Sequence, residues 1–355
     1  MAGAGLAAAP ENPAVIRPAE SARNFIPASD RRFRFEGRMD FTNREAPVVV
    51  WQGSQIALDF EGPRFVLRWR DATGQNFFNV QVDDRNEVMG LSAGATGEIT
   101  WPHPLGAGRH RLTIFKRTEA LAGQVRFAGV ELETGARAWL PAAAKYKLRM
   151  EFHGDSITTG ACAEDGAKDQ WDDRRTHNFA LTYANLTAAE FNAELRCEAV
   201  SGIGIVTGWI DVTAGEMWNR NYPRKDSALA DQTWQPDVLL INLGDNDDDF
   251  PRSRQQPMPG NFTTEYIRLV QAMRRANPQA QIVLLMGGMY SSSQCVPLRQ
   301  AWLAAVEQLE KTDQATSHLV FTHWTQNHPR AAEHRLLADE LNAWLKVQPF
   351  MQRFL

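Results

Sequence analysis

Cysteine is scarce in this chain of 355 residues, which has only Cys162, Cys197 and Cys295, far apart in the sequence. No C-x-x-C pair is present, so the spacing indicates neither a metal ribbon nor a disulfide framework, and we interpret the three thiols as buried or unused groups. No pair of histidines has the spacing of a zinc site. The sequence therefore predicts no metal and no cofactor.

The chain also lacks a marked excess of charge of either sign, because 38 Lys and Arg stand against 42 Asp and Glu, for a net charge of -4. Such a balance gives no electrostatic footprint for nucleic acid. No apolar run approaches the about 18–20 residues that span a bilayer. We therefore expect neither nucleic acid nor a membrane among the partners, and the hydrophobic fraction of 43% is ordinary for a soluble globular protein.

The N-terminal segment is rich in alanine and proline. It has no basic start and no clear apolar stretch, so it is not a convincing signal peptide. We interpret residues 1–31 as a leader, extended along the surface.

Residues 32–142 have the pattern of a β domain. Short strand-like runs such as 55–60, 64–69 and 109–116 are separated by turn residues, as at Glu61-Gly62-Pro63. This pattern, without a strong helical period, predicts a β-sandwich of the jelly-roll type.

Residues 143–355 have a different period, in which strand-like and helical runs alternate. The runs VLLINL and IVLLMG are almost wholly apolar, as expected for strands covered on both faces. The alternation predicts an α/β domain with a parallel sheet and helices on both sides. In such a sheet, ligands bind beyond the carboxyl ends of the strands.

A candidate nucleophile stands at the first of these strand ends. Ser156 follows the strand-like run 146–152, two places after Gly154. A tight turn at that point can lift a hydroxyl clear of the sheet. The motif is not G-x-S-x-G, because Thr158 occupies the place of the second glycine, and an isolated G-D-S is equally compatible with a plain turn.

Three further groups follow later strands: Ser201-Gly202-Ile203-Gly204, Gly244-Asp245-Asn246-Asp247 and Asn327-His328-Pro329. Each also has a structural interpretation, as turn glycines, a solvated acidic loop and a helix start. Their order, each at a strand end, favours a site for acyl transfer.

In that site His328 is the base for Ser156. The backbone N–H groups of Ser156 and Gly204, with the side-chain amide of Asn246, are the candidate donors to the oxyanion. His323, at the end of the same last strand, is a second candidate for the base.

These blocks resemble those of the SGNH, or GDSL, hydrolase superfamily. Gly154-Asp155-Ser156-Ile157 is similar to its first block, Gly204 to its second-block glycine with Gly202 as the competing alignment, and Gly244-Asp245-Asn246-Asp247 to the G-T-N-D block. His328-Pro329 is similar to its H-P ending, with Glu333 in place of a glycine. The resemblance implies a flavodoxin-like catalytic domain.

A closer resemblance extends upstream. The runs GSQIALDFEG, NVQVDD and AGRHRLTIFKRTEALAGQVRFAGVEL, with FHGDSITTG, are similar to the second carbohydrate-esterase family, the acetylxylan-esterase type, over about residues 32–345. It implies a jelly roll before the SGNH domain and metal-free removal of O-acetyl groups from polysaccharides such as xylan and glucomannan, often at primary positions. It also implies secretion or a periplasmic location.

One departure from the superfamily concerns the acid that orients the histidine. Two or three residues before His328, where an aspartate is usual, stand Gln326 and Thr325. Some members of the resembled family work with a Ser–His dyad in which a backbone carbonyl holds the imidazole, so the resemblance implies an active site here even without that aspartate. A distant acid such as Asp247 or Asp249 is the alternative.

Aromatic residues gather in the segment 205–235, and their faces stack well on sugar rings. We predict that they line a glycan cleft, although each also suits core packing: Trp209, Trp218, Tyr222 and Trp234. Trp171 and Trp324 are weaker candidates of the same kind.

The sequence therefore predicts a serine esterase that removes O-acetyl groups from a carbohydrate. Two alternatives stay open: a lipase-like or thioesterase-like SGNH hydrolase, and a glycan-binding protein with a degenerate active site. Whether the jelly roll contributes to the site is also open.

Overall fold

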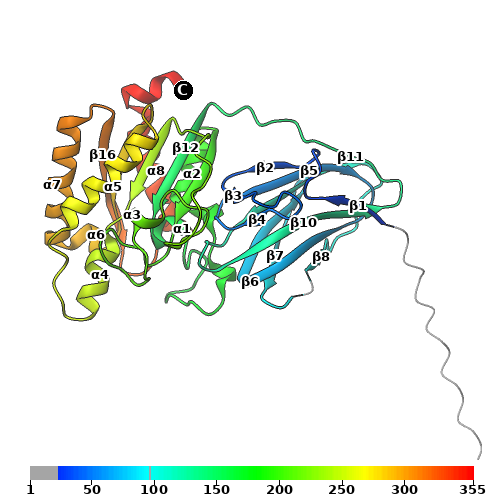
Figure 1. Ribbon diagram of the computed structural model, residues 1–355, viewed down its shortest axis with the longest axis horizontal. Helices are drawn as coiled ribbons and strands as arrows, with labels where there is room; N and C mark the ends of the chain where they lie inside the picture. The colour runs from blue at the N-terminus through cyan, green and yellow to red at the C-terminus, as the bar shows by residue number, and fades with distance from the viewer. Residues whose placement is uncertain (1–22, 96) are drawn as a thin grey trace, which may run out of the picture.

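The computed structural model describes residues 23–95 and 97–355. A unit of antiparallel strands lies beside a unit in which a parallel sheet is covered by helices (Figure 1). Both predicted domain types, and their order along the chain, are thus confirmed. Among the described residues, no helix combines the length and apolar character that crossing a membrane demands.

The antiparallel unit is a two-layered β-sandwich joined by one long strand. β6 (Phe65–Val82) pairs with β10 (Gly123–Glu133) through its first half and with β7 (Arg85–Ser92) and β9 (Arg109–Lys116) through its second. The remaining strands are β2 (Arg34–Glu36), β3 (Met39–Asp40), β4 (Val48–Val49), β5 (Gln55–Glu61), β8 (Glu98–Thr100) and β11 (Ala138–Trp139).

Alternating side chains from both layers of the sandwich meet in one core. Leu58 and Phe60 of β5 lie there with Leu67 of β6 and Phe127 of β10. Such alternation is what a strand with one covered face requires.

The described part of the expected leader belongs to the sandwich. Arg23–Pro27 form β1, which pairs antiparallel with β10. The prediction of a leader up to residue 31 is therefore corrected from residue 23 on, because Ile26 is fully buried in the sandwich core. Residues 1–22 lie outside the described part of the chain.

The second unit has five parallel strands in the order β13-β12-β14-β15-β16. Read by chain position this order is 2-1-3-4-5, which is flavodoxin-like. The strands are β12 (Leu148–Gly154), β13 (Ala193–Ala199), β14 (Val238–Asn242), β15 (Gln281–Met289) and β16 (Thr316–Thr325).

Helices cover both faces of this sheet because both faces are apolar. Leu239 and Ile241 of β14 pack with α3 (Ala214–Met217), α5 (Phe262–Ala276) and α7 (Val296–Thr312). Leu240 packs on the other face, with α2 (Tyr183–Glu190) and α8 (Ala331–Lys346). The shorter helices are α1 (Ser156–Thr159), α4 (Asp245–Ser253), α6 (Tyr290–Gln294), η1 (Arg174–Thr176), η2 (Phe179–Leu181) and η3 (Pro349–Phe354).

The two units share a continuous interface. Val48, Val50 and Trp51 of the sandwich are part of the hydrophobic core on the α3 and α5 side of the parallel sheet. Trp51 also donates its Nε1–H to the Asn221 carbonyl at 2.9 Å, and Gln52 donates to the Ala199 carbonyl at 3.0 Å. The parallel sheet therefore buries apolar surface against the sandwich as well as against its own helices.

A buried ion cluster crosses the same interface. Arg38 of the sandwich, 6% exposed, lies 2.9 Å from Glu198 of β13 and 3.4 Å from Glu151 of β12. Glu151 also bonds His153 at 2.8 Å. Buried carboxylates without a partner are costly, so this arginine is a structural requirement of the interface.

We expect Arg38→Met to lower the free energy of unfolding by about 3–5 kcal/mol, because it leaves Glu151 and Glu198 buried without their cation. Denaturant titration measures the change. The matched control is Arg64→Met, which breaks an exposed pair with Glu133 and is expected to cost under about 1 kcal/mol. Equal losses in the two variants would contradict a structural role for Arg38.

Candidate active site

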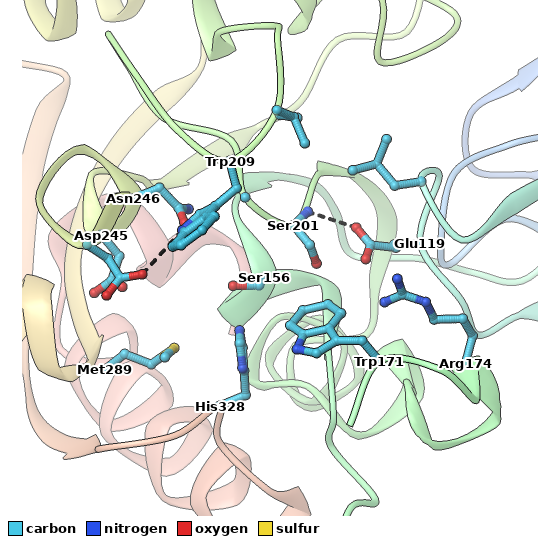
Figure 2. A pocket seen from close by; sticks show the side chains of 14 residues that line it. Glu119, Ser156, Trp171, Arg174, Ser201, Trp209, Asp245, Asn246, Met289 and His328 are labelled. Carbon is cyan, nitrogen blue, oxygen red and sulfur yellow. Dashed lines mark hydrogen bonds between the residues drawn. The ribbon is translucent and has the colours of Figure 1, made fainter. Parts of the chain in front are cut away.

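A cavity of about 460 Å³ lies at the carboxyl ends of the parallel strands, between them and the sandwich (Figure 2). Segments far apart in the sequence meet there, in agreement with the expectation for a parallel sheet. The lining residues are Glu119, Leu121, Ser156, Trp171, Arg174, Ser201, Gly202, Trp209, Ile210, Asp245, Asn246, Asp249, Met289 and His328.

Ser156 lies at the floor of this cavity. β12 ends at Gly154, and Ser156 opens the short helix α1. Asp155 caps that helix, because its side chain accepts the N–H of Ile157 at 3.0 Å. The cap fixes the turn that carries the hydroxyl, and only 7% of Ser156 is exposed.

His328 projects toward Ser156 from the loop between β16 and α8 (Figure 2). Its Nδ1 lies 2.6 Å from Oδ2 of Asp169. The same carboxylate accepts the backbone N–H of His328 at 3.2 Å and pairs with Arg330 at 2.8 Å. With Nδ1–H donated to Asp169, the other ring nitrogen, Nε2, is left as the acceptor for a serine proton.

Asp169 is ionised at neutral pH. Partial burial opposes its charge, but the hydrogen bond and the charge of His328 prevail and lower the pKa of Asp169 to about 2. The carboxylate therefore supplies the acid that is missing next to the histidine in the sequence, and it holds the imidazole in place of a backbone carbonyl.

The two acids named as alternatives have other tasks. Asp247 accepts hydrogen bonds from the backbone N–H groups of Ile205, Val206 and Thr207 at 2.7–3.1 Å. These bonds stabilise the loop after β13. Burial raises the pKa of Asp247 to about 6, against these hydrogen bonds. Asp249 accepts Nε1–H of Trp209 at 3.2 Å.

The glycine that borders the cavity is Gly202. It has a φ of +78°, and an added Cβ would lie 2.9 Å from Cβ of Trp209. Gly204 is absent from the described lining, and its need for glycine is steric, since a Cβ there would lie 1.8 Å from the Thr207 carbonyl oxygen. Of the two glycines weighed for this block, Gly202 is thus the one that lines the cavity.

Asn246 lines the cavity near Ser156, as the sequence predicts. Its amide nitrogen donates one hydrogen to the Ile203 carbonyl at 2.8 Å. A side-chain amide has two such hydrogens, so one remains for a ligand.

Two of the six aromatic candidates line the cavity. Trp209 is 51% exposed and lies on one side of Ser156, and Trp171 is 38% exposed and lies on the other (Figure 2). The Trp171 ring also meets the His328 ring edge-on, at 5.2 Å between centroids. The weaker candidate Trp171 is therefore closer to the chemistry than most of the segment 205–235.

The other aromatic predictions are corrected. Trp218 is buried and packs against His153, and Trp234 lies beneath the guanidinium of Arg196 at 4.4 Å. Tyr222 donates its hydroxyl to Asp40 at 2.6 Å and lines a neighbouring groove, which shares Leu121 with the cavity. Trp324, which packs against Tyr290, and the rival base His323 are outside the described lining.

The β-sandwich does contribute to the site. Glu119 and Leu121, between β9 and β10, line the cavity. Close by, Arg117 pairs with Glu164 and donates to the Arg175 carbonyl at 2.7 Å. The sandwich thus holds both ends of the loop that carries Asp169 and Trp171.

Two clusters offer metal-ligand atoms among the described residues. In the first, Cys162 lies beside Asp169 and His328, but those two bond each other and burial raises the pKa of the Cys162 thiol. A metal needs the thiolate. The second, Glu151, His153 and Glu198, already holds the cation of Arg38.

Comparison with known proteins agrees with this geometry. A family model described as "GDSL-like Lipase/Acylhydrolase family" matches residues 152–346, over half of the chain. The chain belongs to this family. A second model, "Carbohydrate esterase 2 N-terminal", matches residues 35–141, which form most of the sandwich. Both resemblances predicted from the motifs are confirmed.

Relatives within this family are carbohydrate esterases by name. The chain is 29% identical to a cellulase/esterase, CelE, of Acetivibrio thermocellus, over 88% of this chain but only 39% of that protein. It is 27% identical to an acetylxylan esterase/glucomannan deacetylase of Cellvibrio japonicus, over 66% of this chain and 67% of that protein.

A solved relative has the same architecture. A family two carbohydrate esterase from Clostridium thermocellum, in complex with cellohexaose, superposes with a TM-score of 0.79 at 27% identity. The match covers 88% of this chain and 98% of that one. Family and relatives together indicate an ester hydrolase of the carbohydrate-esterase type.

We expect Asp169→Asn to lower kcat for an aryl acetate by about 10²- to 10⁴-fold, because the amide cannot stabilise the imidazolium and favours the wrong tautomer. Circular dichroism checks that the fold is kept. Asp172→Asn, an exposed neighbour in the same loop, is the matched control. Equal activity of both variants would show that the Ser–His pair works without the carboxylate.

Proposed function

We propose that this protein is a serine esterase that removes O-acetyl groups from a carbohydrate such as a xylan or a glucomannan. The observation that carries the proposal is the meeting of Ser156 and His328 in one cavity between two exposed tryptophans, with Nδ1 of His328 bonded to Asp169. The relatives named as acetylxylan esterases and glucomannan deacetylases support the substrate class.

In the first step, Oγ of Ser156 bonds to the acetyl carbon while Nε2 of His328 takes the hydroxyl proton. Asp169 stabilises the imidazolium through Nδ1. The negative charge that forms on the carbonyl oxygen needs donors, and we assign the N–H groups of Ser156 and Gly202 and the amide of Asn246.

Collapse of this intermediate breaks the bond between the acetyl carbon and the sugar oxygen. His328 gives its proton to that oxygen, and the sugar leaves with a free hydroxyl. Water then loses a proton to His328 and attacks the acetyl-enzyme. Acetate leaves, and the proton returns to Ser156.

A glycan-binding protein with a degenerate site is the weaker alternative, because a site without an acid for its histidine would be degenerate and Asp169 supplies that acid. Trp209 and Trp171 offer their faces to a sugar ring on either side of the nucleophile, which supports a carbohydrate substrate. Polysaccharides of this kind lie outside the cytoplasm, so we propose a secreted or periplasmic location.

We expect Ser156→Ala to abolish acetate release from acetylated xylan and acetylated glucomannan, because no other group takes the place of the nucleophile. Acetate is measured directly, and thermal unfolding checks the fold. Ser29→Ala, whose hydroxyl bonds only the exposed Glu45, serves as the control. Turnover retained by the Ser156 variant would exclude the proposed mechanism.

A series of aryl esters tests the acyl group. We expect kcat/KM to fall sharply beyond short acyl chains, because a long alkyl chain would desolvate the polar groups of Asp245, Asn246 and Asp249 in one part of the cavity wall. Rates that rise with chain length would favour the lipase-like or thioesterase-like alternative.

A further inference from the structure

Glu119 is a carboxylate from the β-sandwich that enters the cavity of the other unit. It lies between β9 and β10 and is only 1% exposed, yet it lines the same cavity as Ser156 and His328. The acyl-transfer steps use Ser156, His328, Asp169 and the oxyanion donors, and they leave Glu119 without a task.

The two oxygens of Glu119 have different surroundings. Oε2 accepts the backbone N–H of Ser201 at 2.7 Å. The side chain of Ser201 is a second hydrogen-bond partner of this carboxylate, and no donor from the other described residues reaches the second oxygen, Oε1. Figure 2 shows it directed into the cavity, above Trp171 and beside Arg174.

A carboxylate in this position favours a ligand with hydroxyl donors. Burial raises the pKa of Glu119, against the hydrogen bond from Ser201 and the positive charge of Arg174, so an empty cavity leaves the charged form poorly solvated. Sugar hydroxyls donate strong hydrogen bonds to carboxylates. Trp171, which carries Arg174 over one face of its ring at 4.9 Å, lines the same cavity beside this carboxylate.

We propose that Glu119 is a specificity-determining residue, which accepts a hydrogen bond from a free hydroxyl of the sugar that bears the acetyl group. This inference rests on the proposed function. The sandwich then contributes to substrate specificity, because an acetyl ester without neighbouring hydroxyls has no donor for a hydrogen bond to Glu119.

The same side chain also fixes Ser201, next to Gly202, so a loss of activity alone does not distinguish the two roles. Glu119→Gln separates them, because its amide oxygen still accepts the N–H of Ser201 while the charge is lost. If Glu119 only positions the turn, the variant affects every ester alike. If it binds sugar, the loss depends on the hydroxyls of the substrate.

The experiment compares three substrates: an aryl acetate, a methyl glucoside acetylated at its primary hydroxyl, and the same compound with its other hydroxyls methylated. For the wild type we expect a loss of kcat/KM on methylation. For Glu119→Gln we expect the free-hydroxyl sugar to lose at least about tenfold, the aryl acetate to change less than about threefold, and methylation to have little further effect. Glu61→Gln, in an exposed pair with Arg137, is the control on the same unit.

Equal losses on aryl and sugar acetates, or no loss on either, would overturn the inference and leave the proposed function standing. A methylation effect of the same size in wild type and variant would also overturn it. A wild type that cleaves the aryl acetate but releases no acetate from acetylated xylan, acetylated glucomannan or the glucoside would overturn the proposed function, and the inference with it.

Discussion

The hydrogen-bond register at the centre of the parallel sheet places Gly154 of β12 opposite both Ala199 of β13 and Asn242 of β14. Within four residues of these positions the chain reaches Ser156, Gly202 and Asn246. Ser156 and Gly202 are 46 residues apart in the sequence, and Gly202 and Asn246 are 44 apart. The register thus places polar groups from three distant segments close together. A slip of one residue in either pairing would turn the strand faces over and scatter the site.

The geometry of the site also depends on the bonds that hold the loop between β12 and α2 against the sandwich. Arg117 bonds Glu164 near the start of that loop and the carbonyls of Arg175 and His177 near its end. Asp169 lies in the part between these anchors. The orientation of His328 therefore depends, through Asp169, on a side chain that belongs to the other unit.

Much of this could be predicted from the sequence, because the information is local. The apolar strands and the helical periods give the α/β fold, and Ser156, His328 and Asn246 follow directly from strand ends. The sequence does not show whether Gly202 or Gly204 borders the cavity, because the two glycines are only two residues apart. The conformation of the turn and its steric contacts separate them. Trp218 and Trp234 failed as candidates because composition does not say which face of a loop is covered.

Asp169 could not be predicted, because it acts across 159 positions of the chain. Its loop holds several acids, including Asp165, Asp172 and Asp173, and nothing in the local pattern sets one apart. Only the path of the loop around Arg117 brings that carboxylate to the histidine.

The positions of Arg117 and Glu119 also bear on whether the two units can be separated by a gene rearrangement. A gene rearrangement that cut the chain near residue 142 and joined the α/β unit to another protein would leave behind the anchor of the Asp169 loop and one wall of the cavity. The cavity therefore needs both units on one chain, since each supplies part of its wall or of the support of its loops.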